Sequence, residues 1–128
     1  MSSEDVRSNV EGGQFGIWEE TGLYLNLAIV VGAYEGLGYG ESVGRMIEQE
    51  GLDIPSCEAL IKMARRIAAH SPDKAAAALD LLSALRRQKI EEGFLAIPHP
   101  FKNFSAQGAA YRLNVPFTAH PMIGHDII

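Results

Sequence analysis

Three residues near the end of the sequence, His120, His125 and Asp126, have side chains that could do chemistry together. Histidine can accept or release a proton near neutral pH, so either one could act as a general acid or base. Asp126 could accept a hydrogen bond and orient the neighbouring imidazole. These three residues are the predicted catalytic residues, and the alternative is that the histidines only make loop hydrogen bonds.

A second interpretation adds His99 to this group and makes it a set of metal ligands. Imidazole and carboxylate groups suit zinc, iron or manganese. However, His120 and His125 do not have the spacing that places two ligands on one helix face. We therefore expect no metal cofactor, and a metal-dependent hydrolase remains an alternative.

Other polar and glycine-rich segments offer less specific signals. The stretch 36–44 has several glycines before a helix, but its spacing is one residue too long for a dinucleotide-binding fingerprint and no Walker A lysine follows. It favours a tight turn and close helix packing. Glu19 and Glu20 stand at a predicted helix start, where a pair of carboxylates is usually solvated and stabilises the helix dipole.

Composition limits the function classes. The chain has 128 residues, 47% of them hydrophobic, and a net charge of -5. This is enough apolar material for one domain, and the charge argues against a nucleic-acid partner. The single cysteine, Cys57, cannot form an internal disulfide, and no stretch reads as a signal peptide or a membrane span. We expect a cytoplasmic protein without a membrane partner.

Hydrophobic spacing predicts a chain rich in helix. A buried strand is expected at 115–120, followed by the Gly124-containing turn, which is where parallel α/β sheets place their ligands. Gly51 is the expected end of one helix, Ser56 the N-cap of the next, and residues 94–101 are at most an edge strand and a loop. The predicted helices cover residues 18–33, 41–50, 56–67, 73–90 and 105–113.

Three segments resemble a family of bacterial proteins related to deoxyhypusine synthase: GQFGIWEETGLYLNLAI (13–29), EGLGYGESVGR (35–45) and AAYRLNVPFTAHPMIGHDII (109–128). The resemblance implies an α/β fold with a Rossmann-like parallel sheet. It also implies NAD as cofactor and a transferase reaction in which an aminobutyl group passes from spermidine to a protein lysine. It places Gly124, His125 and Asp126 beside the cofactor and substrate pocket, and it adds Glu19 and Glu20 as cofactor-binding residues.

The sequence also departs from that family. The glycine-rich segment that holds the family's catalytic lysine has no match, because Lys62, Lys74, Lys89 and Lys102 lie in other contexts. Residues 56–93 have the pattern of an inserted helical hairpin. A single convincing strand cannot close a parallel sheet, so we expect either a segment of a larger α/β domain or strands supplied by another chain, as in a homo-oligomer.

These observations lead to one main functional hypothesis and two alternatives. The main hypothesis is a deoxyhypusine synthase-like protein that binds a nucleotide such as NAD, or another small molecule, at the loop 119–126. The first alternative is a helical protein-interaction or oligomerisation module without catalysis. The second is the metal-dependent hydrolase.

Overall fold

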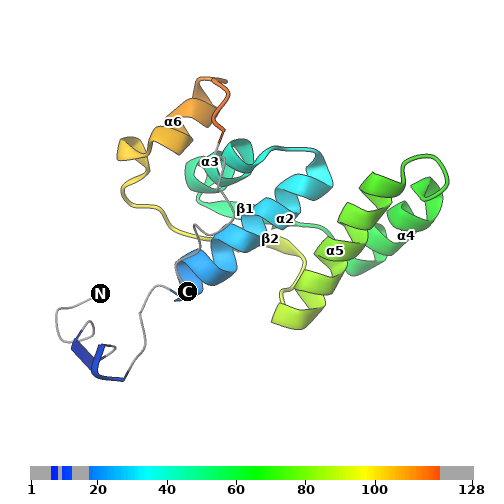
Figure 1. The fold of residues 1–128 in the computed structure, drawn as a ribbon, viewed down its shortest axis with the longest axis horizontal. Helices are drawn as coiled ribbons and strands as arrows, with labels where there is room; N and C mark the ends of the chain where they lie inside the picture. The colour runs from blue at the N-terminus through cyan, green and yellow to red at the C-terminus, as the bar shows by residue number, and fades with distance from the viewer. Residues whose placement is uncertain (1–6, 9, 13–17, 119–128) are drawn as a thin grey trace.

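The computed structural model describes residues 7–8, 10–12 and 18–118, and helices make up most of this part (Figure 1). All five predicted helices are confirmed to within a few residues. The elements from Trp18 onward are the π-helix η1 (Trp18–Leu25), α2 (Asn26–Glu35), α3 (Tyr39–Gln49), β1 (Gly51–Ile54), α4 (Cys57–Ile67), α5 (Pro72–Gln88), β2 (Gly93–Ala96), the 3-10 helix η2 (Lys102–Phe104) and α6 (Ala106–Arg112).

The predicted Rossmann-like parallel sheet is wrong. The sheet of the described residues has two strands, β1 and β2, which pair antiparallel with Leu52 opposite Leu95. The chain leaves the C-terminal end of β1, passes through the two antiparallel helices α4 and α5, and returns to the same end of β1. Strand β2 starts there and therefore runs in the opposite direction to β1. A parallel pair needs a crossover that returns the chain to the start of the first strand. Residues 115–118 form no strand, and 119–120 lie outside the described residues.

Helices α4 and α5 form a hairpin that projects to one side of the molecule (Figure 1). Helix α4 buries Leu60 and Ala64, and α5 buries Ala78 and Leu81, so the two helices share one apolar seam. The arginine pairs near the ends of both helices, Arg65-Arg66 and Arg86-Arg87, are exposed. The hairpin itself is confirmed, whereas its origin as an insertion stays a prediction.

The two helices of the hairpin begin differently, and this difference predicts a measurable contrast. Ser56 Oγ accepts a hydrogen bond of 3.1 Å from the Ala59 amide, whereas Ser71 at the start of α5 makes no such bond. We expect Ser56→Ala to lower the free energy of unfolding by about 1 kcal/mol. Ser71→Ala is the matched control and should change it by less than about 0.5 kcal/mol in urea titrations. Equal losses in the two variants would contradict the capping role.

Helix α2 is the central element, because it packs on α3, α5 and β1 (Figure 1). Its buried residues include Leu27, Ala28 and Val31, which join the hairpin core to the core under α3. At Gly32 the backbone of α2 approaches Ser42 so closely that an added Cβ would lie 1.8 Å from Ser42 Oγ. No helix in the described part of the chain is both long and apolar enough to cross a membrane.

The glycines of segment 36–44 form a turn and close helix contacts, as the sequence predicts. Gly36 has a φ of 83° and ends α2 in the left-handed conformation, which glycine adopts without strain. A Cβ at Gly44 would lie 2.6 Å from the Gln107 carbonyl oxygen of α6. A Cβ at Gly40 would meet the Phe117 carbonyl in the same way. The close packing of α6 and the following segment on α3 depends on these two missing side chains.

Candidate functional site

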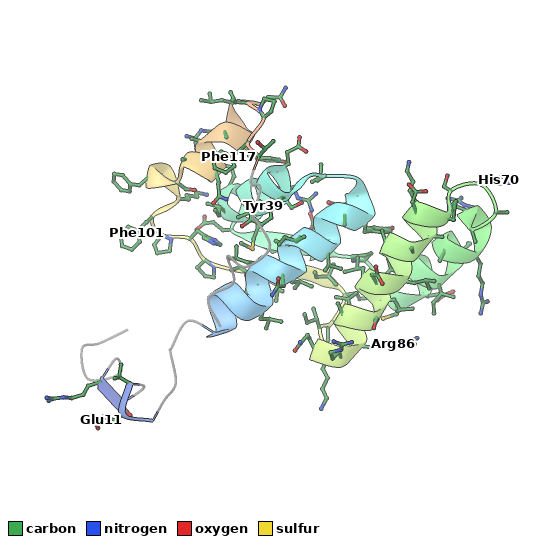
Figure 2. All side chains as sticks on the ribbon, in the orientation of Figure 1. Glu11, Tyr39, His70, Arg86, Phe101 and Phe117 are labelled. Atoms are coloured by element: carbon green, nitrogen blue, oxygen red, sulfur yellow. The ribbon has the colours of Figure 1, made fainter. Side chains whose placement is uncertain are left out.

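A cavity of about 560 Å³ lies between η1, α3 and the segment that connects β2 to α6. Most of its wall is apolar, and its polar side chains are those of Tyr24 in η1 and of His99, Lys102 and Ser105 in the connecting segment. Figure 2 shows Phe101 at the outer edge of the molecule, on this same connecting segment. The lining residues are Tyr24, Leu25, Met46, Ile47, Ile97, Pro98, His99, Pro100, Phe101, Lys102 and Ser105.

His99 is held in one orientation by two hydrogen bonds. Its backbone amide donates to Glu50 Oε1 at 3.2 Å, and its ring nitrogen Nδ1 lies 2.7 Å from the Ile97 carbonyl oxygen. A carbonyl oxygen can only accept, so Nδ1 must carry the proton of this bond. In the neutral ring the second nitrogen, Nε2, is then the unprotonated acceptor. No residue in the described range 18–118 makes a hydrogen bond to Nε2.

Glu50 connects the segment around His99 to the end of α3. It has a φ of 55°, so the helix ends at this residue in a left-handed conformation and β1 starts directly after it. Its carbonyl accepts from the Ile97 amide at 2.8 Å, and its Oε2 accepts from Lys102 Nζ at 2.9 Å. Lys102 also donates to the Glu48 carbonyl at 3.0 Å. One wall of the cavity is thereby fixed to α3 by both backbone and side-chain bonds.

The hydrogen bond from Lys102 is the largest cause that lowers the pKa of Glu50 from its ordinary value of 4.5, and the bond from the His99 amide adds to it. A carboxyl whose pKa is lowered by folding stabilises the folded state above its unfolded pKa, and this contribution is lost as pH falls through the lowered folded value. We expect Glu50→Gln to be less stable than the unaltered chain at neutral pH. The difference should shrink below pH 4.5.

Urea unfolding from neutral pH down to about pH 3 measures this difference. Glu92→Gln, at an exposed position, removes one negative charge without touching the site and serves as control. A Glu50→Gln difference that grows as the pH falls would contradict the assigned ion pair.

The predicted catalytic residues His120, His125 and Asp126, and the predicted cofactor residue Gly124, lie outside the described residues. Glu19 and Glu20 lie in the first turn of η1. His99 is the one histidine of the predicted set that the structure describes, and it lines the cavity. Among the described residues, no group of three or more His, Cys, Asp or Glu side chains is arranged to hold a metal ion.

Three residues of this site were not predicted as site residues: Tyr24 and Lys102, which line the cavity, and Glu50, which bonds Lys102 and the His99 amide. Glu50 and Lys102 are 52 positions apart in the sequence, and no local motif connects them. The π-helical turn that carries Tyr24 has no sequence signature of its own, although π-helices often occur at functional sites. The pattern Pro98-His99-Pro100 was the available signal, since two prolines restrict the backbone around a histidine.

Comparison of the chain with protein-family models, with curated proteins and with solved structures found no match. The arguments about function therefore start from the cavity and the residues that line it.

Proposed function

We propose that this protein binds a small, largely apolar organic molecule in the cavity beside His99. The observation that carries the proposal is the combination of an apolar wall with one oriented imidazole. Ligand sites in proteins are commonly apolar hollows of about 300–1,000 Å³ with a few placed polar groups, and this cavity has about 560 Å³.

Two other polar side chains of the wall, Lys102 and Ser105, already have partners within the protein. Lys102 bonds Glu50 and the Glu48 carbonyl, and Ser105 Oγ accepts the Gly108 amide at 3.1 Å as the N-cap of α6. These bonds support the shape of the cavity. Nε2 of His99 and the hydroxyl of Tyr24 are the polar side-chain atoms of the lining that make no hydrogen bond to a described residue.

Methyl NMR spectroscopy tests the proposal. With 1-naphthol as probe, the methyl signals of Met46, Ile47 and Ile97 should shift together and saturate, since all three line the cavity. The methyl groups of Ile61 and Ile67 in α4 are the internal reference and should not move. Signals that stay unchanged up to the solubility limit of the probe, or shifts of equal size in α4, would overturn the proposal.

The resemblance to deoxyhypusine synthase makes NAD a specific ligand to include in the same titration. Binding should raise the thermal midpoint of unfolding or change the fluorescence of Trp18. If NAD does so and also shifts the three cavity methyls, the ligand is a nucleotide bound at this cavity. A stabilising effect that leaves those methyls unmoved would favour the loop 119–126. If neither readout changes, the nucleotide proposal fails.

Self-association is the second candidate function, and exposed apolar side chains favour it. Phe101 is 76% exposed, Phe104 is 89% exposed and Leu113 is 69% exposed, all on η2, α6 or the turns beside them. If copies of the chain pair through this surface, Phe104→Asp should convert the dimer to a monomer in light scattering. Leu79→Asp, on the exposed face of α5, is the control and should not. A monomeric unaltered chain would reject this candidate.

A further inference from the structure

We propose that the cavity selects an aromatic or other planar apolar molecule carrying a neutral hydroxyl group, and that His99 Nε2 accepts the hydrogen bond from this hydroxyl. The inference rests on the proposed function and names the class of ligand. It follows from the tautomer of the imidazole, the charge balance beside the cavity and the apolar character of the rest of the cavity.

The tautomer of the neutral His99 ring is fixed by its neighbours. The Ile97 carbonyl, 2.7 Å from Nδ1, requires a proton on that nitrogen. The backbone of His99 is restrained, because the His99 amide donates to Glu50 Oε1 and because Pro98 and Pro100 flank the residue. The ring therefore stays beside the Ile97 carbonyl. In the neutral form, Nε2 therefore offers a lone pair and no proton. A ligand that donates a hydrogen bond fits this nitrogen, and one that only accepts does not.

The positive charge of the wall is balanced by a neighbouring carboxylate, and this balance disfavours an anionic ligand. Lys102 is the cationic side chain that lines the cavity among the described residues, and its ammonium forms an ion pair with Glu50 at 2.9 Å. Glu48 and Arg112, at the neighbouring contact of α3 and α6, form another pair at 3.0 Å. A carboxylate ligand would have to compete with Glu50 for Lys102. A neutral hydroxyl leaves this pair intact.

The remaining wall suits the body of such a ligand. Leu25 of η1, Met46 and Ile47 of α3 and Ile97 after β2 present aliphatic or thioether surface, and Phe101 adds an aromatic ring. Aromatic rings and methionine sulfur make favourable contacts with a planar apolar molecule. The hydrogen bond from the ligand hydroxyl to His99 Nε2 then fixes how the ligand is oriented against this apolar surface.

Three naphthalene probes that differ in one substituent test the inference in the full chain. 1-Naphthol has the donor, 1-methoxynaphthalene lacks it, and naphthalene-1-carboxylate is anionic. At about pH 8, where histidine is normally neutral, 1-naphthol should bind about tenfold more tightly than the methoxy compound, since one hydrogen bond distinguishes them. The carboxylate should bind no better than the methoxy compound. Tighter binding of the carboxylate would overturn the inference.

His99→Asn separates the two ring nitrogens. The asparagine amide can still donate to the Ile97 carbonyl, but it has no group in place of Nε2. We expect the preference for 1-naphthol to fall to within about twofold in this variant. Unchanged shifts of the Met46 methyl group in the free protein would confirm that the cavity keeps its structure. His70→Asn, at the far tip of the hairpin (Figure 2), is the control and should keep the full preference.

The tautomer of His99 can be measured directly. Two-bond ¹H–¹⁵N correlation spectra of the free protein should show the pattern of a ring protonated at Nδ1 for His99 and so test the assignment without any ligand. The opposite pattern would overturn the inference. Equal binding of 1-naphthol and 1-methoxynaphthalene would overturn it while leaving the proposed function intact, and absence of binding by all probes would reject both.

Discussion

Leu81→Ala is expected to lower the free energy of unfolding by about 2–5 kcal/mol, the range for removing a fully buried leucine side chain. Leu81 is 0% exposed and lies on the face of α5 that joins the hairpin to the central core. Helix α5 packs on α4 and α2, and close-packed structure relaxes only partly around a deleted side chain, so a cavity remains. Urea unfolding monitored by circular dichroism measures the loss.

The same helix supplies the control. Leu79 lies two positions away and is 50% exposed, so Leu79→Ala removes the same atoms from a half-solvated site. We expect a change below about 1 kcal/mol there. Helix propensity changes equally in both variants, so the difference between them isolates burial. Similar losses at both positions would mean that α5 does not pack on α2 and α4 as described.

Gly32→Ala is expected to lower the free energy of unfolding by about 2 kcal/mol. An added Cβ would lie 1.8 Å from Ser42 Oγ and 2.5 Å from Ser42 Cβ, so α2 and α3 would have to separate. Overpacking of this kind costs up to about 3 kcal/mol, and about 1 kcal/mol returns because alanine favours a helix more than glycine does. Ser42 is 1% exposed and its hydroxyl donates to the Gly38 carbonyl at 2.7 Å, so turning its side chain away would break a buried hydrogen bond.

A double-mutant cycle tests the cause of this loss. Ser42→Gly removes the two atoms that an alanine at position 32 would meet first, and the next atom, Ser42 Cα, is at 3.4 Å. In the Ser42→Gly background, Gly32→Ala should therefore be close to neutral or slightly stabilising. If Gly32→Ala lowers the free energy of unfolding equally in both backgrounds, the close approach of α2 to α3 is not the reason that glycine is needed at position 32.

The helices could be predicted because their signals are local. Ser56 gives a capping side chain at the right position, and Pro72 is tolerated in the first turn of α5. The boundary at Gly51 was wrong for a physical reason. Glycine is the usual residue after a helix, but here Glu50 adopts the left-handed conformation and Gly51 is the first residue of β1, with the ring of Phe94 over it.

The sheet and the cavity could not be predicted, because both depend on contacts between distant segments. The apolar run 115–120 has the composition of a buried strand, but composition does not supply a pairing partner, and residues 115–118 form no strand. The sequence suggested His99 as a possible metal ligand. In the fold, His99 instead lies beside the Ile97 carbonyl, Glu50 and Lys102. Only the return of the chain after β2 to the end of α3 brings these groups together.

The antiparallel pairing of β1 with β2 has a consequence for the order of folding. The two strands flank the whole α4–α5 hairpin, so pairing them first would close a long unfolded loop at a high cost in entropy. Prior formation of the hairpin brings the end of β1 beside the start of β2 and removes most of that cost. We therefore expect the local contacts of α4 with α5 to be part of the folding nucleus, and the sheet with the cavity beside it to be completed late. Substitutions in the hairpin core should slow refolding, whereas substitutions in β2 or at His99 should mainly accelerate unfolding.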